Sequence, residues 1–400
     1  MSRKVQVFLS GVFMAIIFAV PISQAGLDVY LGRLPQFADV FTQVPTRSNL
    51  RAFEKDLEGA SVYAKAIRPW IQSVFFLALR DPGDKAVMGR DGWLFYRPDV
   101  QYLLETDVPQ GDTGSGTLRR VLRVPPPVEP APTFEDPVSA IVNFREQLYR
   151  QGIHLLVLPM PGKPSVYPDK LTRRGLLQGR DFVSPTRRLI SMLRTSGVET
   201  VDLFETFLLG RQARLDVAEP YYLAQDTHWS GAGVRIAAQV VAHRLLELGW
   251  VQTGSTDYEV KPVLLRRQGD IIRMVNVPSL EWTFPAEQLH CFQVFEGERG
   301  NLYKDEISST VLLLGDSFFR IYETDEPGSA GFIAHLAREL RAPLSSIVND
   351  GGASTLVRQQ LGRRPGLLRG KKVVIWEFVE RDIRFGTDGW KYVPLPGDRE

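Results

Sequence analysis

The stretch STVLLLGDSFF, residues 309–319, places Gly-Asp-Ser directly after a run of apolar residues. The apolar residues 311–314 predict a strand buried on both faces, as in a parallel sheet covered by helices. Ser317 would then lie at the carboxyl end of that strand, where open α/β sheets bind their ligands. Gly-Asp-Ser alone is typical of a turn or a helix cap. Its function therefore depends on what else the chain brings to this edge.

A strand and helix alternation begins at residue 138 and continues on both sides of residues 309–319. The predicted helices lie near 138–151, 184–196, 230–248, 328–341 and 353–362, and the other predicted strands are IHLLVLPM (153–160), ETVDLFETF (199–207), LSSIVND (344–350) and KKVVIWEF (371–378). Apolar runs separated by helices predict an α/β fold, a three-layer sandwich with a parallel central sheet.

A carboxylate and a histidine precede the helix predicted for 230–248, in QDTHWSGAG, residues 225–233. The hydroxyl of Ser317 is a weak nucleophile and needs a base that a third group orients. His228 is the candidate base, and Asp226 would fix its tautomer, while Ser230 is the expected N-cap of the helix. An isolated Asp-x-His is more often a capping arrangement. Together with Ser317 it indicates an acyl-transfer site at one edge of the sheet.

Backbone amides are the expected donors to the negative charge that develops during acyl transfer. The N–H of Ser317 would begin a helix, and Gly351 or Gly352 follows the next strand along the chain. Glycine allows the backbone to approach a ligand closely. These three groups are therefore the candidate oxyanion donors.

The other histidines and the single cysteine, Cys291, are weaker candidates for a functional site. His154 begins a predicted strand, His243 and His335 lie in predicted helices, and His290 lies in an irregular segment. One cysteine excludes an intrachain disulfide and a multi-cysteine metal site. No clustered third ligand lies near Asp226 and His228 in the sequence, so we expect no metal.

The N-terminal segment predicts export. Basic Arg3 and Lys4 precede an apolar run up to residue 22, and Ser23 and Ala25 suit cleavage after Ala25. The run is also long enough for an uncleaved anchor in the inner membrane. Residues 1–25 are therefore a signal peptide or an anchor, and the rest of the chain is expected outside the cytoplasm, in the periplasm of a Gram-negative source.

Three further segments complete the expected organisation. Residues 26–84 form an N-terminal helical segment, because 46–80 show apolar positions at helical spacing. Asp91-Gly92 predicts a hairpin turn before a strand at 93–96. Residues 107–137 form a Pro/Gly-rich loop, and 250–305 an insertion of short strands or loops. Beyond residue 25 the chain carries 46 basic and 46 acidic residues, so its bulk charge predicts no nucleic-acid partner.

The chain resembles the SGNH hydrolase superfamily and, within it, the alginate O-acetyltransferase family of AlgJ and AlgX type. The motifs are DGWLFY (91–96), LPMPGKPSVYPD (158–169), DTHWS (226–230), GDS (315–317) and WEFVERDI (376–383), spread over residues 85–385. The resemblance implies a flavodoxin-like sheet that is circularly permuted, because the Asp and His motif precedes the Ser motif. Residues 85–390 would be the acetyltransferase domain.

The resemblance also implies further site residues. The superfamily's oxyanion asparagine has no counterpart after the strand at 371–378. Arg381 stands there instead, either as a donor in the active site or, as we favour, as an ion-pair partner of Glu377. Asn349 is a weak substitute for that asparagine. Lys163 and Tyr167 follow a neighbouring strand and are candidates for contact with an anionic polysaccharide, although a solvated loop lysine is the default.

Two features limit the resemblance. Asp316 stands where many family members carry a less acidic residue, and no carbohydrate-binding module follows residue 390. We therefore expect the chain to be more similar to the membrane-tethered AlgJ branch.

The implied activity is transfer of acetyl groups, through an acyl-serine, to hydroxyls of an exopolysaccharide such as alginate. The implied partners are that polysaccharide, a membrane-bound O-acyltransferase as acetyl donor and other exopolysaccharide-assembly proteins; no cofactor is implied. The same triad would also suit a carbohydrate acetylesterase, with water as acceptor. A third hypothesis is that the protein is a non-catalytic subunit in polysaccharide assembly.

Overall fold

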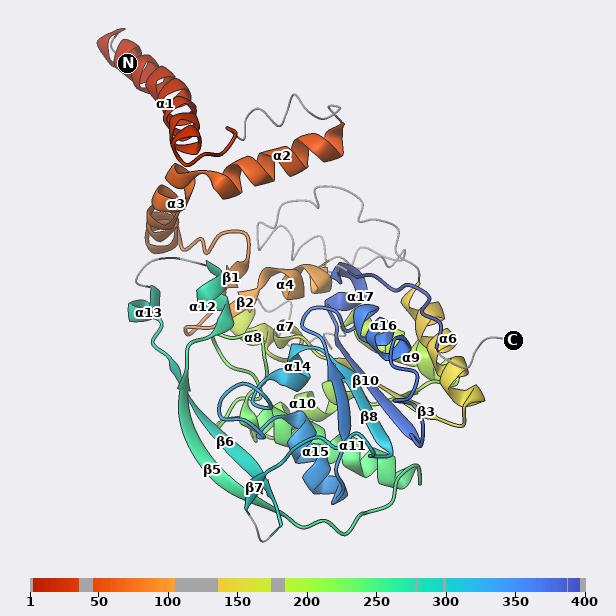
Figure 1. The fold of residues 1–400 in the computed structure, drawn as a ribbon. Helices are drawn as coiled ribbons and strands as arrows, with labels where there is room; N and C mark the ends of the chain where they lie inside the picture. The colour runs from red at the N-terminus through yellow and green to blue at the C-terminus, as the bar shows by residue number, and fades with distance from the viewer. Residues whose placement is uncertain are drawn as a thin grey trace, which may run out of the picture. The chain divides into compact units, whose positions relative to one another are not determined.

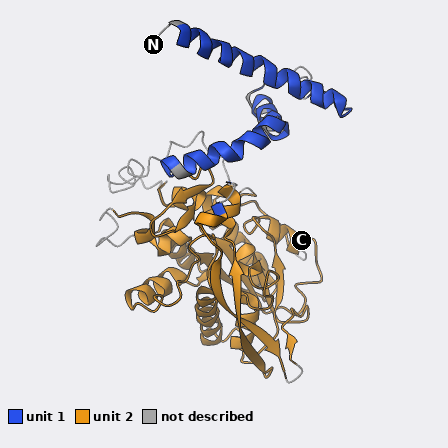
Figure 2. Cartoon of the chain, turned by 90° about the vertical axis from the view of Figure 1, so that its left-hand side faces the viewer, with its two compact units in different colours: residues 1–81, 276–280 blue, residues 82–275, 281–400 orange. Residues whose placement is uncertain are grey.

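The computed structural model describes residues 3–35, 46–104, 136–173, 184–275, 277, 280–297, 300–386 and 388–395. The chain divides into two compact units, residues 1–81 with 276–280 and residues 82–275 with 281–400 (Figure 2). The Pro/Gly-rich loop predicted for residues 107–137 lies, up to residue 135, outside the described residues.

A five-stranded parallel sheet forms the centre of the larger unit (Figure 1). Its order is β4 (Glu199–Thr200), β3 (His154–Met160), β10 (Val373–Val379), β8 (Val311–Gly315) and β9 (Ser345–Val348). Read from the other side, this is the flavodoxin-like order 2-1-3-4-5, with β8 in the place of the first strand. Because β3 and β4 precede β8 in the chain, the sheet is circularly permuted, as the sequence predicts.

Helices cover both faces of this sheet. One face packs against α6 (Pro137–Arg150), α9 (Pro185–Thr195) and α16 (Leu356–Gly362), and the other against α10 (Leu203–Gln212), α11 (Gly231–Glu247) and α15 (Phe332–Leu340). Successive strand residues alternate between the two cores: Leu312 and Leu314 face the first set, and Val311 and Leu313 the second. The predicted three-layer α/β fold is confirmed.

Short helices follow the carboxyl ends of three central strands. They are α7 (Lys163–Val166) and α8 (Pro168–Leu171) after β3, α14 (Ser317–Arg320) after β8 and α17 (Asp382–Phe385) after β10. A further helix, α4 (Arg97–Leu104), contacts α7 and α17. Segments distant in sequence therefore meet at one edge of the sheet (Figure 1).

One predicted strand is wrong over most of its length. Of residues 199–207, only Glu199–Thr200 form a strand, and α10 begins at Leu203. The carboxylate of Asp202 accepts hydrogen bonds from the N–H groups of Phe204 and Glu205, at 3.0 and 3.4 Å. This N-cap starts the helix within an apolar run that also suits a strand.

The predicted hairpin turn lies between β1 (Ala86–Met88) and β2 (Leu94–Tyr96), which pair antiparallel. Asp91 and Gly92 both have left-handed backbone angles, with φ of 55° and 80°. Two such residues in succession are what a type I′ turn requires.

The insertion at 250–305 is more regular than predicted. It contains β5 (Tyr258–Arg267) and β6 (Glu287–Glu296), which pair antiparallel over ten residues each, and β7 (Asn301–Leu302). Two short helices, α12 (Asp270–Val275) and α13 (Leu280–Thr283), lie between β5 and β6. Most of β5 faces solvent, so its sequence lacks the apolar alternation that predicts a strand.

The smaller unit holds α1 (Arg3–Tyr30), α2 (Arg47–Ala60), α3 (Val62–Val74) and the π-helical turn η2 (Phe75–Leu79). Helices thus occupy the stretch in which the sequence predicts them. By length and composition, residues 4–30 of α1 suffice to cross a membrane, and their most apolar 18-residue window has a mean hydropathy of 2.3. The helix continues through Ala25, the predicted cleavage position.

The cap of α11 generates a prediction for stability. Ser230 Oγ accepts from the N–H of Gly233 at 3.3 Å and donates to the carbonyl of Pro220 at 2.5 Å. Ser230→Ala should lower the free energy of unfolding by about 1 kcal/mol, measured by urea denaturation. Ser191→Ala, at an exposed position inside α9, is the control and should change it little. Equal stability of the two variants would contradict the assigned cap.

Candidate active site

Ser317 lies at the turn between β8 and α14. Asp316 caps α14, its carboxylate accepting from the N–H of Phe318 at 2.8 Å. Gly315 allows the turn to be tight, because a Cβ there would lie 2.4 Å from the ring of Phe319 and 2.6 Å from Glu377 Oε2. The sequence Gly-Asp-Ser thus ends the strand, starts the helix and places the serine at the edge of the sheet.

The structure brings the three expected residues together. His228 Nε2 lies 2.9 Å from Ser317 Oγ, and His228 Nδ1 lies 2.7 Å from Asp226 Oδ1. The backbone N–H of His228 donates to the same carboxylate at 3.1 Å. Asp226 is fully buried and His228 is 5% exposed. A serine, a base and an oriented carboxylate in this geometry can perform nucleophilic acyl transfer.

Two residues of the insertion contact Asp226, and neither was predicted from the sequence. Arg267, the last residue of β5, donates from Nε to Asp226 Oδ2 at 3.2 Å, and the N–H of Asp270 donates to the same oxygen at 3.1 Å. The carboxylate of Asp270 in turn accepts from the N–H of Thr227 at 2.7 Å. Gly269 permits this approach, since a Cβ there would lie 2.1 Å from the carbonyl oxygen of Gln225. The sequence carries no signal for these contacts beyond a Gly-Asp turn.

The carboxylates around His228 favour its protonated form, against the effect of burial. Burial lowers the pKa of His228, but the hydrogen bond and the charge of Asp226, with the charge of Asp270, raise it above its ordinary value. Burial raises the pKa of Asp226, but the bond to His228 and the charge of Arg267 outweigh that and hold it well below its usual range. Burial and the neighbouring Asp226 raise the pKa of Asp270.

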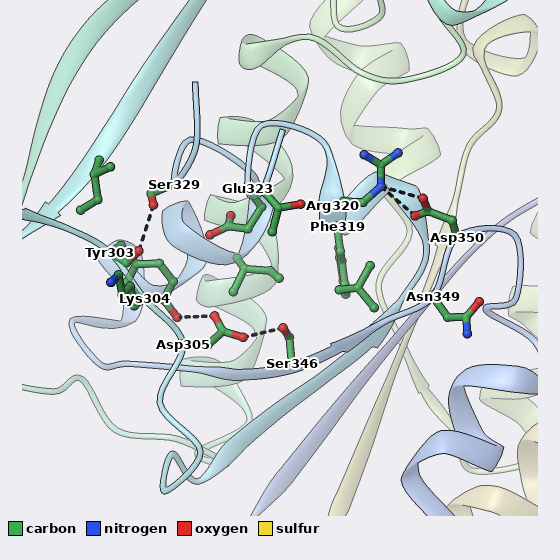
Figure 3. A pocket seen from close by; sticks show the side chains of 14 residues that line it. Tyr303, Lys304, Asp305, Phe319, Arg320, Glu323, Ser329, Ser346, Asn349 and Asp350 are labelled. Atoms are coloured by element: carbon green, nitrogen blue, oxygen red, sulfur yellow. Dashed lines mark hydrogen bonds and ion pairs between the residues drawn. The ribbon is translucent and has the colours of Figure 1, made fainter. Parts of the chain in front are cut away.

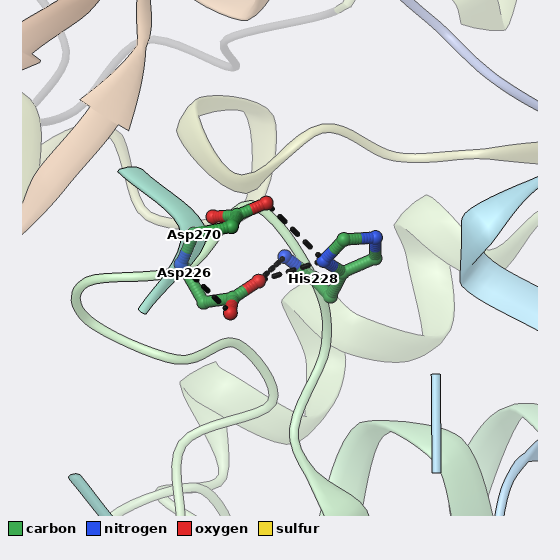
Figure 4. A group of neighbouring side chains, drawn as sticks. All are labelled: Asp226, His228 and Asp270. Atoms are coloured by element: carbon green, nitrogen blue, oxygen red, sulfur yellow. Dashed lines mark hydrogen bonds and ion pairs between the residues drawn. The ribbon is translucent and has the colours of Figure 1, made fainter. Parts of the chain in front are cut away.

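Asp226, His228 and Asp270 lie close enough together for one metal ion to reach them all (Figure 4). No third ligand was expected from the sequence, and Asp270 corrects that expectation. A cationic group is already present, because the guanidinium of Arg267 contacts Asp226. His228 Nδ1 is also engaged with Asp226 at 2.7 Å. The cluster therefore fits a hydrogen-bonded network better than a metal site.

Lys163 is neither the solvated loop lysine expected by default nor placed for the candidate contact with a polysaccharide. Its side chain is fully buried, and its Nζ donates to the carbonyls of Leu223, Ala224 and Asp226 at 3.1, 3.1 and 2.7 Å. Burial lowers its pKa to about 8. Lys163 holds the loop that carries Asp226 and His228.

Tyr167 is also buried, at 2% exposure. Its hydroxyl donates to Asp216 and accepts from the N–H of Tyr221, both at 2.9 Å. The predicted contact with substrate is therefore corrected to a structural one, because the side chain points into the protein.

Arg381 has a different partner from the one predicted. Its Nη1 donates to buried Asp99 of α4 at 3.0 Å, and its Nε lies 3.8 Å from Asp382. Glu377 instead accepts from the backbone N–H of Asp316 at 3.0 Å. Glu377 follows Trp376, which pairs with Leu314 of β8, so it lies beside the turn after β8, whereas Arg381 follows the end of β10. The pairing with Glu377 is thus wrong, but Arg381 does fix the loop after β10.

Of the predicted oxyanion donors, Gly352 is already engaged. Its N–H donates to the carbonyl of Asn349 at 3.2 Å, which closes a turn. Gly351 lies in this turn with a φ of 69°. The turn neighbours the nucleophile, since the N–H of Asn349 donates to the carbonyl of Gly315 at 3.0 Å. Ser317 occupies the first position of α14, where a helix leaves its amides without intrahelical partners.

A pocket of about 840 Å³ adjoins α14 (Figure 3). Phe319, Ile333 and Val348 give it an apolar part, and its polar lining includes Asn349 and Arg320. Arg320 donates from Nε to Asp350 at 2.8 Å. Most of the residues that line this pocket are polar or charged, and neither Ser317 nor His228 is among them.

Comparisons with known proteins agree with this architecture. The chain is 21% identical over 319 residues to the probable alginate O-acetylase AlgJ of Pseudomonas aeruginosa, covering 76% of this chain and 71% of AlgJ. It is 23% identical over 304 residues to the alginate biosynthesis protein AlgX of the same organism, covering 73% of this chain and 55% of AlgX.

Solved structures show the same fold. The O-acetyltransferase domain of Pseudomonas putida AlgJ matches with a TM-score of 0.54 at 18% identity, covering 75% of this chain and 92% of that domain. Pseudomonas aeruginosa AlgX matches with a TM-score of 0.51 at 21% identity, covering 74% and 62%. A family model described as "SGNH hydrolase-like domain, acetyltransferase AlgX" matches residues 86–380. Because this match spans well over half of the chain, the protein belongs to that family of SGNH hydrolase-like acetyltransferases.

Proposed function

We propose that the protein transfers acetyl groups, through an acyl-serine, to hydroxyls of an exopolysaccharide, with alginate, named for its relatives, as the first candidate. The observation that carries the proposal is the hydrogen-bonded series from Ser317 through His228 to Asp226, at 2.9 and 2.7 Å. Membership of an acetyltransferase family supports the type of group transferred.

In the first half of the reaction, Ser317 Oγ attacks the acetyl carbonyl of a donor while His228 Nε2 takes the hydroxyl proton. Asp226 stabilises the imidazolium that forms. The Ser317 N–H and the turn at Gly351 are the proposed donors to the negative oxygen. Collapse of the tetrahedral intermediate expels the donor's oxygen, which takes the proton from His228 and leaves an acetyl ester on Ser317.

In the second half, His228 removes a proton from a sugar hydroxyl. The resulting oxygen attacks the acetyl-serine ester, and His228 returns the proton to Ser317 Oγ as the ester bond breaks. The products are an acetylated sugar and free enzyme. Every proton is carried by His228, so these steps use only residues of this chain and the two substrates.

The N-terminal helix supports the proposal that the rest of the chain lies outside the cytoplasm, in the periplasm. Acetyl-CoA is absent there, so we propose a membrane-bound O-acyltransferase as the acetyl donor and other exopolysaccharide-assembly proteins as partners. The polymer itself is the acceptor.

Loss of the nucleophile tests the function. Ser317→Ala should lower release of nitrophenol from nitrophenyl acetate, and acetyl transfer to oligomannuronate, by about 10³-fold or more. Ser308→Ala, at an exposed position, is the matched control and should keep wild-type activity. Mass spectrometry of the products separates transfer from hydrolysis. Free acetate alone, with acceptor present, would instead support an esterase, and full activity of Ser317→Ala would refute the acyl-serine.

Arg267 should matter for positioning Asp226. Arg267→Gln removes the cation beside a fully buried carboxylate, so kcat should fall at least tenfold while KM changes little. Arg266→Gln is the matched control, because Arg266 is the exposed neighbour on the same strand. Equal kcat values for the two variants would contradict the role assigned to Arg267.

Neutralising Asp270 should shift the pH dependence. The charge of Asp270 helps to raise the pKa of His228, and only neutral His228 can act as a base. In Asp270→Asn the pKa of His228 should fall, so the acidic limb of the kcat/KM profile should move to lower pH. Glu259→Gln, at the far end of β5, should leave the profile unchanged. A limb that stays in place, or moves to higher pH, would contradict the coupling.

A further inference from the structure

Helix α3 carries an apolar face that is exposed along its whole length. Tyr63, Ile67, Trp70, Ile71 and Val74 recur at helical spacing and are 38%, 50%, 68%, 48% and 61% exposed. All residues of α3 are described, and each of them is at least partly exposed. A contiguous apolar face of this kind on a helix indicates a partner that covers it.

The polar side of α3 is basic. At 100° per residue, Lys65 lies about half a turn from the centre of the apolar face and Arg68 about a third of a turn, and α3 contains no acidic residue. An apolar face with Trp and Tyr, combined with basic residues on the polar face, is the composition of helices that lie in a membrane interface. A protein partner would not by itself select this charge pattern.

The contacts between α1 and α3 fix where α3 begins relative to the apolar stretch of α1. Residues 5–22 of α1 carry no charged side chain, and these 18 residues are about 27 Å long as a helix, close to the thickness of a bilayer's hydrocarbon core. Directly after them, Ser23 Oγ accepts from the hydroxyl of Tyr63 at 2.8 Å, and Gln24 Oε1 accepts from the N–H of Val62 at 3.0 Å. The first turn of α3 is thus tied to the point at which α1 would leave the hydrocarbon.

We propose that α3 is an interfacial helix that lies in the outer headgroup region of the membrane spanned by α1, with Tyr63, Ile67, Trp70, Ile71 and Val74 toward the lipid tails. Lys65 and Arg68 face the lipid phosphates and water. The assignment requires α1 to be retained as an anchor, since Ser23 and Gln24 belong to the junction. It is independent of the acetyltransferase proposal.

Site-specific labelling of the full chain tests the proposal. Single cysteines at Ile67, Ile71 and Val74 would carry an NBD fluorophore in vesicles of phosphatidylethanolamine and phosphatidylglycerol, and Cys291 is buried and stays unlabelled. We expect blue-shifted emission and quenching by lipids with a doxyl group at carbon 5. The matched position Lys65, on the opposite side of the helix, and Leu215 of the larger unit, which is 71% exposed, should show neither.

Two spectral results would overturn the assignment. Water-like emission at Ile67, Ile71 and Val74 would show that the apolar face is not in lipid. Blue-shifted emission without quenching by the doxyl lipids would show that a protein surface, such as a second copy of the chain, covers it. Mass analysis of the protein from cells provides a further check, because cleavage after Ala25 would destroy the junction and refute the anchor.

Discussion

The site depends on keeping the carboxylate of Asp226 ionised although it has no exposure to solvent. An unpaired charge in such a position costs several kcal/mol, which hydrogen bonds and an opposite charge have to offset. Four donors do this: His228 Nδ1, the N–H groups of His228 and Asp270, and Arg267 Nε. With the carboxylate held in place, the ring of His228 has one orientation, and its Nε2 faces Ser317 Oγ.

Two other buried acids near the nucleophile, Glu377 and Asp316, meet the cost of burying a charge in a different way. Glu377 and Asp316 are both buried acids, and the backbone N–H of Asp316 donates to Glu377 Oε2 at 3.0 Å. Burial, followed by the charge of Asp316, raises the pKa of Glu377 well above its ordinary value, which favours its neutral form. Two ionised carboxylates could not share this space. Glu377 thus holds the turn before Ser317 by accepting a backbone hydrogen bond, and its raised pKa limits the negative charge beside the nucleophile.

Local sequence patterns were sufficient to predict the sheet and the three residues that meet at its edge. Apolar runs fix β3, β8 and β10, and parallel strands bring their carboxyl ends to one edge. Contacts across the fold were not predictable in this way. Lys163 reads as a solvated loop lysine, because nothing in the sequence shows that three carbonyl groups surround it. Likewise, the sequence shows Arg267 only as one charged residue in a polar strand. Its contact with Asp226 follows from the folding of the β5–β6 hairpin.

Circular permutation explains why a hairpin reaches the site. In an unpermuted sheet of this order, α11 would end the chain and β8 would begin it, so residues 248–310 are the joint that connects the two ends. This joint starts near the amino edge of the sheet, where the N–H of Gly254 donates to the carbonyl of Leu340 at the end of α15. A ten-residue strand spans about 33 Å, and β5 uses this length to carry Arg267 to the opposite edge, beside Asp226. The connection that permutation requires has thus become the element that supplies the counter-ion of the catalytic carboxylate we propose.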